Sequence, residues 1–409
     1  MADVDDRWYR TVKEPDGKSR RVPTARHSNG KRWDVRWRDD AGRQRHKAFE
    51  RKQDAETFLV QVSADLARGV YVDPAAGKRR LRAYAEDWLA NQTFDASTRE
   101  AVELRLRLHV FPVLGDRQLR ALALQPSLVQ SWTRGLQQQL APNYVRVVFA
   151  NLSAVFQAAM DDGLIGKNPC RAGSVKPPAP DRRKVVPWTI ERVAAVRAGL
   201  PERYAAVVDV GAGCGLRQGE VFGLAVEEVD FLRGTLHVCR QVKIVGSKLV
   251  FAPPKRGKDR DVPLAGSVAL RLAAHLQAWP AVAVTLPWLP TGKTETVRLI
   301  FTTRERTAVA RTYFNRHIWK PALVQAEVPA TRENGMHALR HHYASVLLED
   351  AVSPKALAEY LGHADPGFTL RVYAHLMPSS EDRARKAVNQ AFGAAPLAAS
   401  APDVRQGEQ

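Results

Sequence analysis

The pattern of apolar and polar positions near the N-terminus predicts a small sheet covered by one helix. In the segment KRWDVRWR, Trp33, Val35 and Trp37 alternate with polar residues, which is the period of a half-buried strand. A turn at 39–42 and a returning strand over 43–49 follow. Helical spacing then links a set of apolar residues: Ala55, Phe58, Leu59, Val62 and Leu66. Residues 1–27 are polar and basic, and we expect them to be loose.

The pattern from residue 81 to residue 162 is helical throughout. We expect four short helices, the second ending before Pro112 and the fourth opening at Pro142. Few side chains in this segment could carry out a reaction. The segment is therefore typical of a binding or scaffolding domain.

A proline-rich basic segment, RAGSVKPPAPDRRKVVP at 171–187, predicts a linker before a third and largest unit. This unit opens with a helix capped by Thr189 and a second helix from Tyr204 to Gly211. Short strands and hairpins are expected over 230–250 and before Pro263, with mainly helices afterwards. The final segment, 395–409, has little hydrophobic bulk and is expected to be disordered.

Charge indicates a polyanionic partner. Lysine and arginine number 62 against 43 acidic residues, a net charge of +19 with a pI near 10.1. Between Lys18 and Lys52 there are 13 basic and 4 acidic residues, which makes the small sheet a plausible DNA-binding module. The alternative is that these charged side chains form a water-exposed face of the sheet and bind no partner. The candidate DNA-binding residues are Arg32, Arg36, Arg38, Arg43, Arg45, Arg99 and Arg146.

Cysteine usage and hydropathy bear on the compartment. The three cysteines are far apart and form no CxxC pair, which argues against a disulfide framework or a structural zinc site. The charged N-terminus is not a secretory signal, and no apolar run reaches the roughly 20 residues needed to cross a bilayer. We expect a cytoplasmic protein with no membrane partner.

The residues that could carry chemistry gather between His337 and His375, a stretch with five of the eleven histidines. His337 and Arg340 are three apart and would share one face of a helix. Upstream, Arg217 stands three residues before Glu220, so that a carboxylate could hold a guanidinium rigidly for a phosphate. The alternative is a structural ion pair. The functional interpretation makes Tyr373 a nucleophile, with the two arginines holding the phosphate oxygens.

A competing interpretation uses the histidines as metal ligands. Their spacing matches neither HExxH nor a facial triad, nearby carboxylates are few, and two arginines would repel a cation. We therefore expect no metal. The histidines concerned are His337, His341, His342, His363 and His375.

Four segments together resemble the signature boxes of the tyrosine recombinase (phage integrase) family. They are GCGLRQGEVFGL, PPKRGKDRDVPL, HALRHHYAS and LGHADPGFTLRVYAHL, in that order along the chain. One such box alone would be weakly specific. The resemblance covers nearly the whole chain and includes the large-integrase layout, with an N-terminal arm-type module.

The resemblance implies a catalytic set made of Arg217, Lys255, His337, Arg340, His363 and Tyr373, with Glu220 in support. Tyr373 would attack the phosphate and Lys255 would protonate the departing 5′-hydroxyl. His341, His342 and His375 are interpreted as packing or supporting residues. One departure leaves the lysine open: the family often has a small hydroxyl residue after it, but Arg256 follows here, so Lys258 is an alternative to Lys255.

The fold implied by the resemblance has three domains. These are an arm-type domain at 18–72, a three-stranded β-sheet plus helix; an all-α, SAM-like core-binding domain at 78–171; and a mainly α (α+β) catalytic domain at 182–394. The implied function is site-specific DNA recombination through a 3′-phosphotyrosyl intermediate, without cofactor, by a homo-tetramer on attachment sites of a mobile element. A directionality factor or a host DNA-bending protein is a possible partner. Two alternatives stay open, a type IB topoisomerase-like enzyme and a catalytically idle DNA-binding accessory protein.

Overall fold

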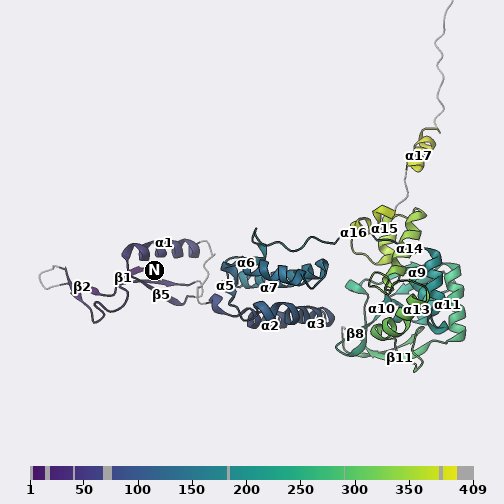
Figure 1. Ribbon diagram of the computed structural model, residues 1–409, viewed down its shortest axis with the longest axis horizontal. Coiled ribbons are helices and arrows are strands. Elements are labelled where there is room, and N and C mark those ends of the chain that lie inside the picture. The colour runs from purple at the N-terminus through teal and green to yellow at the C-terminus, as the bar shows by residue number, and fades with distance from the viewer. Residues whose placement is uncertain are drawn as a thin grey trace, which may run out of the picture. The chain divides into compact units, whose positions relative to one another are not determined.

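The structure is a computed structural model that describes residues 3–13, 19–39, 42–67, 76–181, 185–289, 291–376 and 381–393. The chain divides near residue 182 into two compact units, each described by itself below (Figure 1). The tail expected to be disordered, 395–409, lies outside the described residues, as does part of the expected linker at 171–187.

A three-stranded antiparallel sheet near the N-terminus has the order β1-β4-β5 and packs against one helix. Its elements are β1 (Asp3–Asp6), β4 (Trp33–Arg38), β5 (Gln44–Phe49) and α1 (Lys52–Ala67). Val35 and Trp37 are buried, and the Trp37 ring meets Phe58 of α1 at 5.4 Å between centroids. The alternation in β4 and the helical spacing in α1 therefore predicted these elements correctly.

The expectation that residues 1–27 are loose is wrong for residues 3–13 and 19–27. Besides β1, this segment forms a hairpin of β2 (Tyr9–Lys13) and β3 (Ser19–Pro23). Asp6 accepts hydrogen bonds from the backbone of Trp8 and Tyr9 and from the Arg32 guanidinium. These polar contacts and the strand ladders hold the segment, so hydrophobic alternation could not reveal it.

The segment from residue 76 to residue 181 is helical around its own core. The expected second helix does not stop before Pro112: α3 continues through a π-helical turn, η2, into α4, which contains Pro112. A short helix, α5, was not expected, whereas Pro142 opens α7 as predicted. The bounds are η1 (Ala76–Lys78), α2 (Leu81–Ala90), α3 (Ala96–Arg105), η2 (Leu106–Val110), α4 (Phe111–Leu114), α5 (Leu119–Leu124), α6 (Pro126–Gln137), α7 (Pro142–Asp161) and η3 (Pro169–Arg171).

The second unit begins with α8 (Ile190–Ala198), whose first turn is capped by Thr189 as predicted, since its hydroxyl accepts from the Arg192 amide at 3.3 Å. The next helix, α9 (Glu202–Cys214), is longer than the predicted Tyr204–Gly211. The first half continues with α10 (Gln218–Phe222), η4 (Val226–Glu228), β6 (Val229–Asp230), β7 (Thr235–Val238), β8 (Gln241–Val245), β9 (Lys248–Ala252), η5 (Lys255–Gly257) and β10 (Arg260–Pro263).

The remainder of this unit is mainly helical, except for a hairpin of β11 and β12 that the sequence reasoning did not anticipate. Its elements are α11 (Gly266–Ala278), β11 (Val282–Pro287), β12 (Thr294–Leu299), α12 (Arg311–Phe314), η6 (Asn315–Trp319), α13 (Lys320–Gln325), α14 (His337–Glu349), α15 (Pro354–Leu361), α16 (Pro366–Tyr373), η7 (Ala374–Leu376) and α17 (Glu381–Gly393).

Helices α9 and α14 pack together at the centre of the second unit, and their side chains belong to one continuous core. β10 pairs with β7 in a three-stranded sheet of order β10-β7-β6 and also contacts α15. As a result, α10, β10, α14 and the end of α15 bring charged side chains to one place. Among the described helices, none is long and apolar enough to cross a bilayer.

Candidate active site

The site is built on a sharp turn at the end of α9. Gly215 adopts a left-handed φ of 65° and redirects the chain into Arg217, the N-cap residue of α10. Glu220, in the first turn of α10, accepts from the backbone N of Arg217 at 2.9 Å and from its Nη1 at 2.8 Å. The predicted Arg217–Glu220 pair therefore exists, but Arg217 precedes the helix instead of lying within it.

A second arginine, which the sequence reasoning missed, completes this ion pair. Arg260 of β10 donates from Nη2 to Oε2 of Glu220 at 2.7 Å and from Nη1 to Oε1 at 3.2 Å. Both side chains are almost fully buried. Burial alone would raise the pKa of Glu220, but the hydrogen bonds and charge of Arg260, together with Arg217, lower it to about 2. Glu220 is thus a permanent anion held between two arginines.

Arg340 of α14 is fully buried and is fixed by backbone carbonyls. Its Nη1 donates to Gly215 O at 2.8 Å, and its Nη2 donates to Leu361 O. Its Nε has no hydrogen-bond partner among the described residues. Burial and the neighbouring charge of Arg217 lower the pKa of Arg340. An anion at this position would relieve the repulsion between the two guanidinium groups.

His363 stands just after α15, where Gly362 turns the chain with a φ of 62°. Its Nε2 lies 3.1 Å from Nη2 of Arg340, and its Nδ1 lies 2.8 Å from the Thr369 hydroxyl. Because an arginine can only donate, Nε2 accepts and Nδ1 carries the proton. Burial, with the charge of Arg340, lowers the pKa of His363 to about 4, so the ring is neutral.

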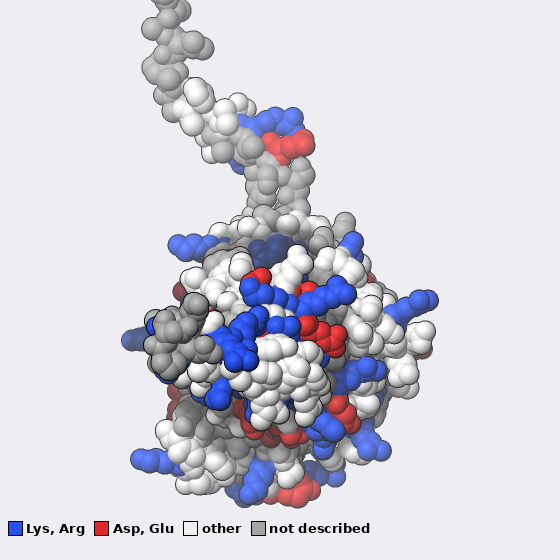
Figure 2. Space-filling model, turned by 90° about the vertical axis from the view of Figure 1, so that its left-hand side faces the viewer, with Lys and Arg blue, Asp and Glu red and all other residues white. Residues whose placement is uncertain are grey.

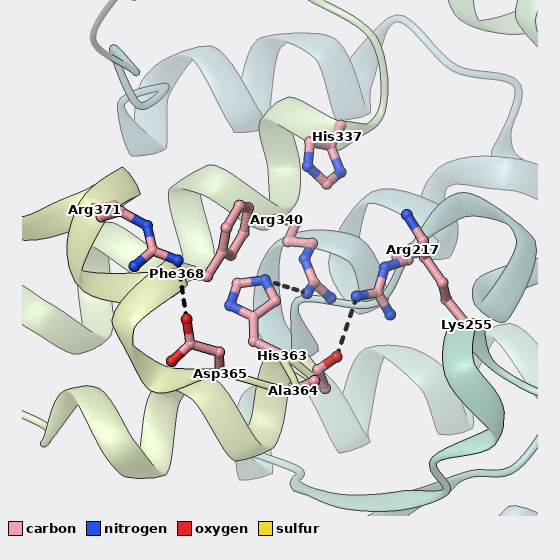
Figure 3. A pocket seen from close by; sticks show the side chains of 10 residues that line it. Arg217, Lys255, His337, Arg340, His363, Ala364, Asp365, Phe368 and Arg371 are labelled. Carbon is pink, nitrogen blue, oxygen red and sulfur yellow. Dashed lines mark hydrogen bonds and ion pairs between the residues drawn. The ribbon is translucent and has the colours of Figure 1, made fainter. Parts of the chain in front are cut away.

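A cavity of about 360 Å³ opens between these groups, and Figure 3 shows Arg217, Arg340 and His363 converging on it, with Lys255 and His337 at its edges. Burial and the nearby charges lower the pKa of His337 to about 3. Asp365 and Arg371, joined at 2.9 Å, also line the cavity, although the sequence reasoning singled out neither. The full lining is Arg217, Lys255, His337, Arg340, Gly362, His363, Ala364, Asp365, Phe368 and Arg371.

Of the two candidate lysines, Lys255 lines the cavity and Lys258 does not. Lys255 lies in the short turn η5 between β9 and β10, and not in the tight turn that joins β8 to β9. Its side chain is exposed at the cavity mouth. The geometry therefore favours Lys255 over Lys258 as the group that reaches a bound phosphate.

Tyr373 is the last residue of α16 and is only 2 % exposed. It is not among the residues that line the cavity. Burial raises the pKa of Tyr373 to about 12, although Arg340 and Arg217 act in the opposite direction. Its hydroxyl lies 2.8 Å from Nδ1 of His341, a residue that the sequence reasoning had set aside as packing or support. Two other histidines assigned that role, His342 and His375, contact the backbone carbonyls of Trp188 and Val185.

Most of the candidate DNA-binding arginines have intramolecular partners. Arg32 pairs with Asp6, Arg36 with Asp5 and Asp34, and Arg43 and Arg45 with Asp39. Arg99 and Arg146 donate to backbone carbonyls. Arg38 is exposed. Figure 2 shows Lys and Arg side chains spread over the face in view, with Asp and Glu side chains between them.

Residues 189–379 match the profile described as the phage integrase family. This part of the chain belongs to the tyrosine recombinase family. The integrase of Mycobacterium phage D29 is 25 % identical to this chain over 348 residues, which cover 83 % of this chain and 88 % of the phage protein.

Two solved structures have a similar fold. The Tn1549 transposon integrase, in complex with transposon right-end DNA, has a TM-score of 0.62 and 19 % identity, and the match covers 77 % of this chain and all of that chain. A lambda integrase tetramer bound to a Holliday junction has a TM-score of 0.55 and 15 % identity, over 84 % of this chain and 92 % of its own.

Proposed function

We propose that this tyrosine recombinase is a site-specific DNA recombinase that cuts and rejoins strands through a 3′-phosphotyrosyl intermediate. The observation that carries the proposal is the convergence of Arg217, Arg340 and Lys255 on one cavity, with the Tyr373 hydroxyl on the adjoining helix. The three cations suit a phosphodiester, and a tyrosine beside them suits nucleophilic attack on it.

The proposed chemistry assigns one role to each group. Arg217 and Arg340 stabilise the charge that grows on the phosphate oxygens in the transition state, and their fixed geometry means that little reorganisation is needed. Glu220 and Arg260 hold Arg217 in place. Lys255 protonates the departing 5′-oxygen as general acid. His337 and His363 contribute hydrogen bonds to the bound phosphate. The covalent intermediate conserves the bond energy, so that rejoining to another strand needs no cofactor.

The biological setting belongs to the same proposal. The relatives named integrase support integration or excision of a mobile element such as a prophage, and the neighbour described as a tetramer on a Holliday junction supports a homo-tetramer on double-stranded attachment sites. We also propose the three-domain layout, with the N-terminal sheet as the arm-type module and the helical segment as the core-binding domain. We further propose that the protein is cytoplasmic and that a directionality factor or a DNA-bending protein assists the reaction.

The test is to trap the covalent adduct on a nicked suicide substrate, from which the cleaved strand end diffuses away. Wild type is expected to form a stable protein–DNA adduct carrying the 3′ end, and Tyr373→Phe is expected to form none, since the attacking oxygen is missing. Absence of an adduct with wild type, or its persistence in Tyr373→Phe, would refute the proposal. Relaxation of supercoiled DNA lacking an attachment site would instead favour the topoisomerase-like alternative.

A further inference from the structure

We propose that His341 is the proton acceptor for Tyr373. The inference rests on the proposed function, since it assigns the base for the same strand-cleavage step. Cleavage requires the Tyr373 hydroxyl to lose its proton as the oxygen attacks phosphorus. Among the residues that the structure describes, the histidine whose ring nitrogen lies at hydrogen-bond distance from that hydroxyl is His341, at 2.8 Å.

The fold places this pair firmly. His341 lies on α14, directly after Arg340, and Tyr373 ends α16, so two separate helices meet at the contact. The two rings are 5.6 Å apart between centroids with an interplanar angle of 60°, and the His337 ring packs against His341 at 4.6 Å. Both partners are largely withdrawn from water. A base held against the nucleophile in this way needs no water molecule as intermediary.

The other two histidines of the site are less well placed for this role. His363 uses Nε2 for Arg340 and Nδ1 for Thr369, so both of its ring nitrogens are engaged. His337 lines the cavity, where the phosphate would lie, and no hydrogen bond joins it to the Tyr373 hydroxyl among the described residues. His341, by contrast, contacts the reacting oxygen directly.

The charges around His341 favour the form that can accept a proton. Burial, with the charge of Arg340, lowers the pKa of His341 to about 4, so its ring is neutral at neutral pH. The other titratable groups facing it are His337 on its own helix, Tyr373 on α16 and His363 after α15. With its proton on Nε2, His341 accepts the hydroxyl hydrogen bond at Nδ1. A bound phosphate anion would then stabilise the imidazolium that forms.

The Oη–phosphorus bond forms while the bond from phosphorus to the 5′-oxygen breaks, and the Tyr373 proton passes to Nδ1 of His341. Lys255 supplies the proton that the 5′-oxygen takes up. Strand joining reverses each transfer: His341 returns its proton to the tyrosine, and Lys255 recovers one from the attacking 5′-hydroxyl.

The experiment measures single-turnover cleavage of the suicide substrate by the full-length chain. His341→Asn keeps an amide oxygen that can accept the hydroxyl hydrogen bond but cannot take the proton. We expect its cleavage to be about 100-fold or more slower than wild type. Its rate should also rise with pH between about pH 6 and about pH 9, because the tyrosine must ionise unaided, whereas the wild-type rate changes little. His237→Asn is the matched control, since His237 also bonds through Nδ1, to Asp261, and both side chains are exposed on the face of a sheet away from the cavity lining.

A second substrate separates the base from the acid. When sulfur replaces the bridging 5′-oxygen, the leaving group needs no proton, so Lys255→Ala should recover most of its rate and His341→Asn should stay slow. The inference would be overturned if His341→Asn cleaved with the rate and pH profile of wild type. It would also be overturned if the sulfur-substituted substrate restored the cleavage rate of His341→Asn. If His341→Asn unfolds, His341→Gln is tested in the same way. Failure of wild type itself to form the adduct would count against the proposed function instead.

Discussion

At the scale of single residues, the most strongly perturbed acid in the site is Glu220, and its ionisation is linked to stability. Its pKa is lowered from 4.5 to about 2 in the folded chain. The stabilisation is therefore fully present above a pH of about 4.5 and is lost as the pH falls toward about 2. We expect it to be on the order of 3 kcal/mol. The measurement is the free energy of unfolding of wild type minus that of Glu220→Gln, in denaturant, as a function of pH.

The comparison isolates this carboxylate because every other acidic group titrates in both proteins. Asp261→Asn serves as the control, since Asp261 is exposed and its loss should produce no comparable pH-dependent difference. A Glu220→Gln difference that stays constant across the acidic range would mean that Glu220 is not held as an anion by Arg260 and Arg217.

Local spacing explains which site residues could be predicted from the sequence. The shared position of His337 and Arg340 follows from helical geometry, and Arg217 and Glu220 are only three residues apart. Arg260 is 40 residues from Glu220, and His341 is 32 residues from Tyr373. These contacts depend on how β10, α14 and α16 pack, which no local pattern encodes. The sequence did offer one signal for Arg260 and His341: they lie within the family-like segments PPKRGKDRDVPL and HALRHHYAS.

At the scale of elements, the turn after α9 carries a testable constraint. Gly215 has a left-handed φ, its carbonyl holds Arg340, and a Cβ there would clash with the Tyr343 ring. Gly215→Ala is expected to lose about 1–2 kcal/mol from backbone strain and about 1–3 kcal/mol more from the clash. Because Arg340 would shift with the turn, adduct formation should fall as well. Denaturant unfolding and the suicide-substrate assay measure the two effects.

Gly292→Ala is the matched control for this turn. Gly292 has a similar φ of 69° in the same unit, but nothing lies within 4 Å of an added Cβ. Only the backbone cost of about 1–2 kcal/mol should appear, with adduct formation unchanged. Equal losses in the two variants would show that the Tyr343 contact contributes nothing to the rigidity of the turn.

Several of the elements that the sequence predicted share one property, a clear apolar periodicity. β4, α1 and α7 each bury a regular set of side chains and were recognised from it. β2 and β3 are almost entirely exposed, and so they have no buried face from which a period could be read. The hairpin of β11 and β12 was missed although both strands alternate between exposed and less exposed positions and bury Val284 and Leu299, so the period was present in the sequence.

At the scale of the whole molecule, the groups assigned to the reaction and the candidate DNA-binding arginines lie in different units of the chain. Every group assigned to the reaction lies in the second unit, between Arg217 and Tyr373. The first unit contributes basic surface, yet six of its seven candidate arginines are engaged with carboxylates or carbonyls. Binding of DNA by this unit would therefore depend on arginines that keep free donors, or on other lysines and arginines of a chain whose net charge is +19.

This separation predicts different salt dependences for the full chain and for a fragment of residues 183–409. Each phosphate neutralised by a lysine or arginine adds about −0.9 to the slope of log affinity against log salt. The full chain should show the steeper slope, because its first unit adds phosphate contacts to those of the second. Fluorescence anisotropy with a labelled attachment-site duplex, from about 50 to about 200 mM salt, measures both slopes. Circular dichroism first establishes that the fragment is folded. Equal slopes would mean that the first unit makes no phosphate contacts on that duplex, and its assignment as a DNA-binding module would fail.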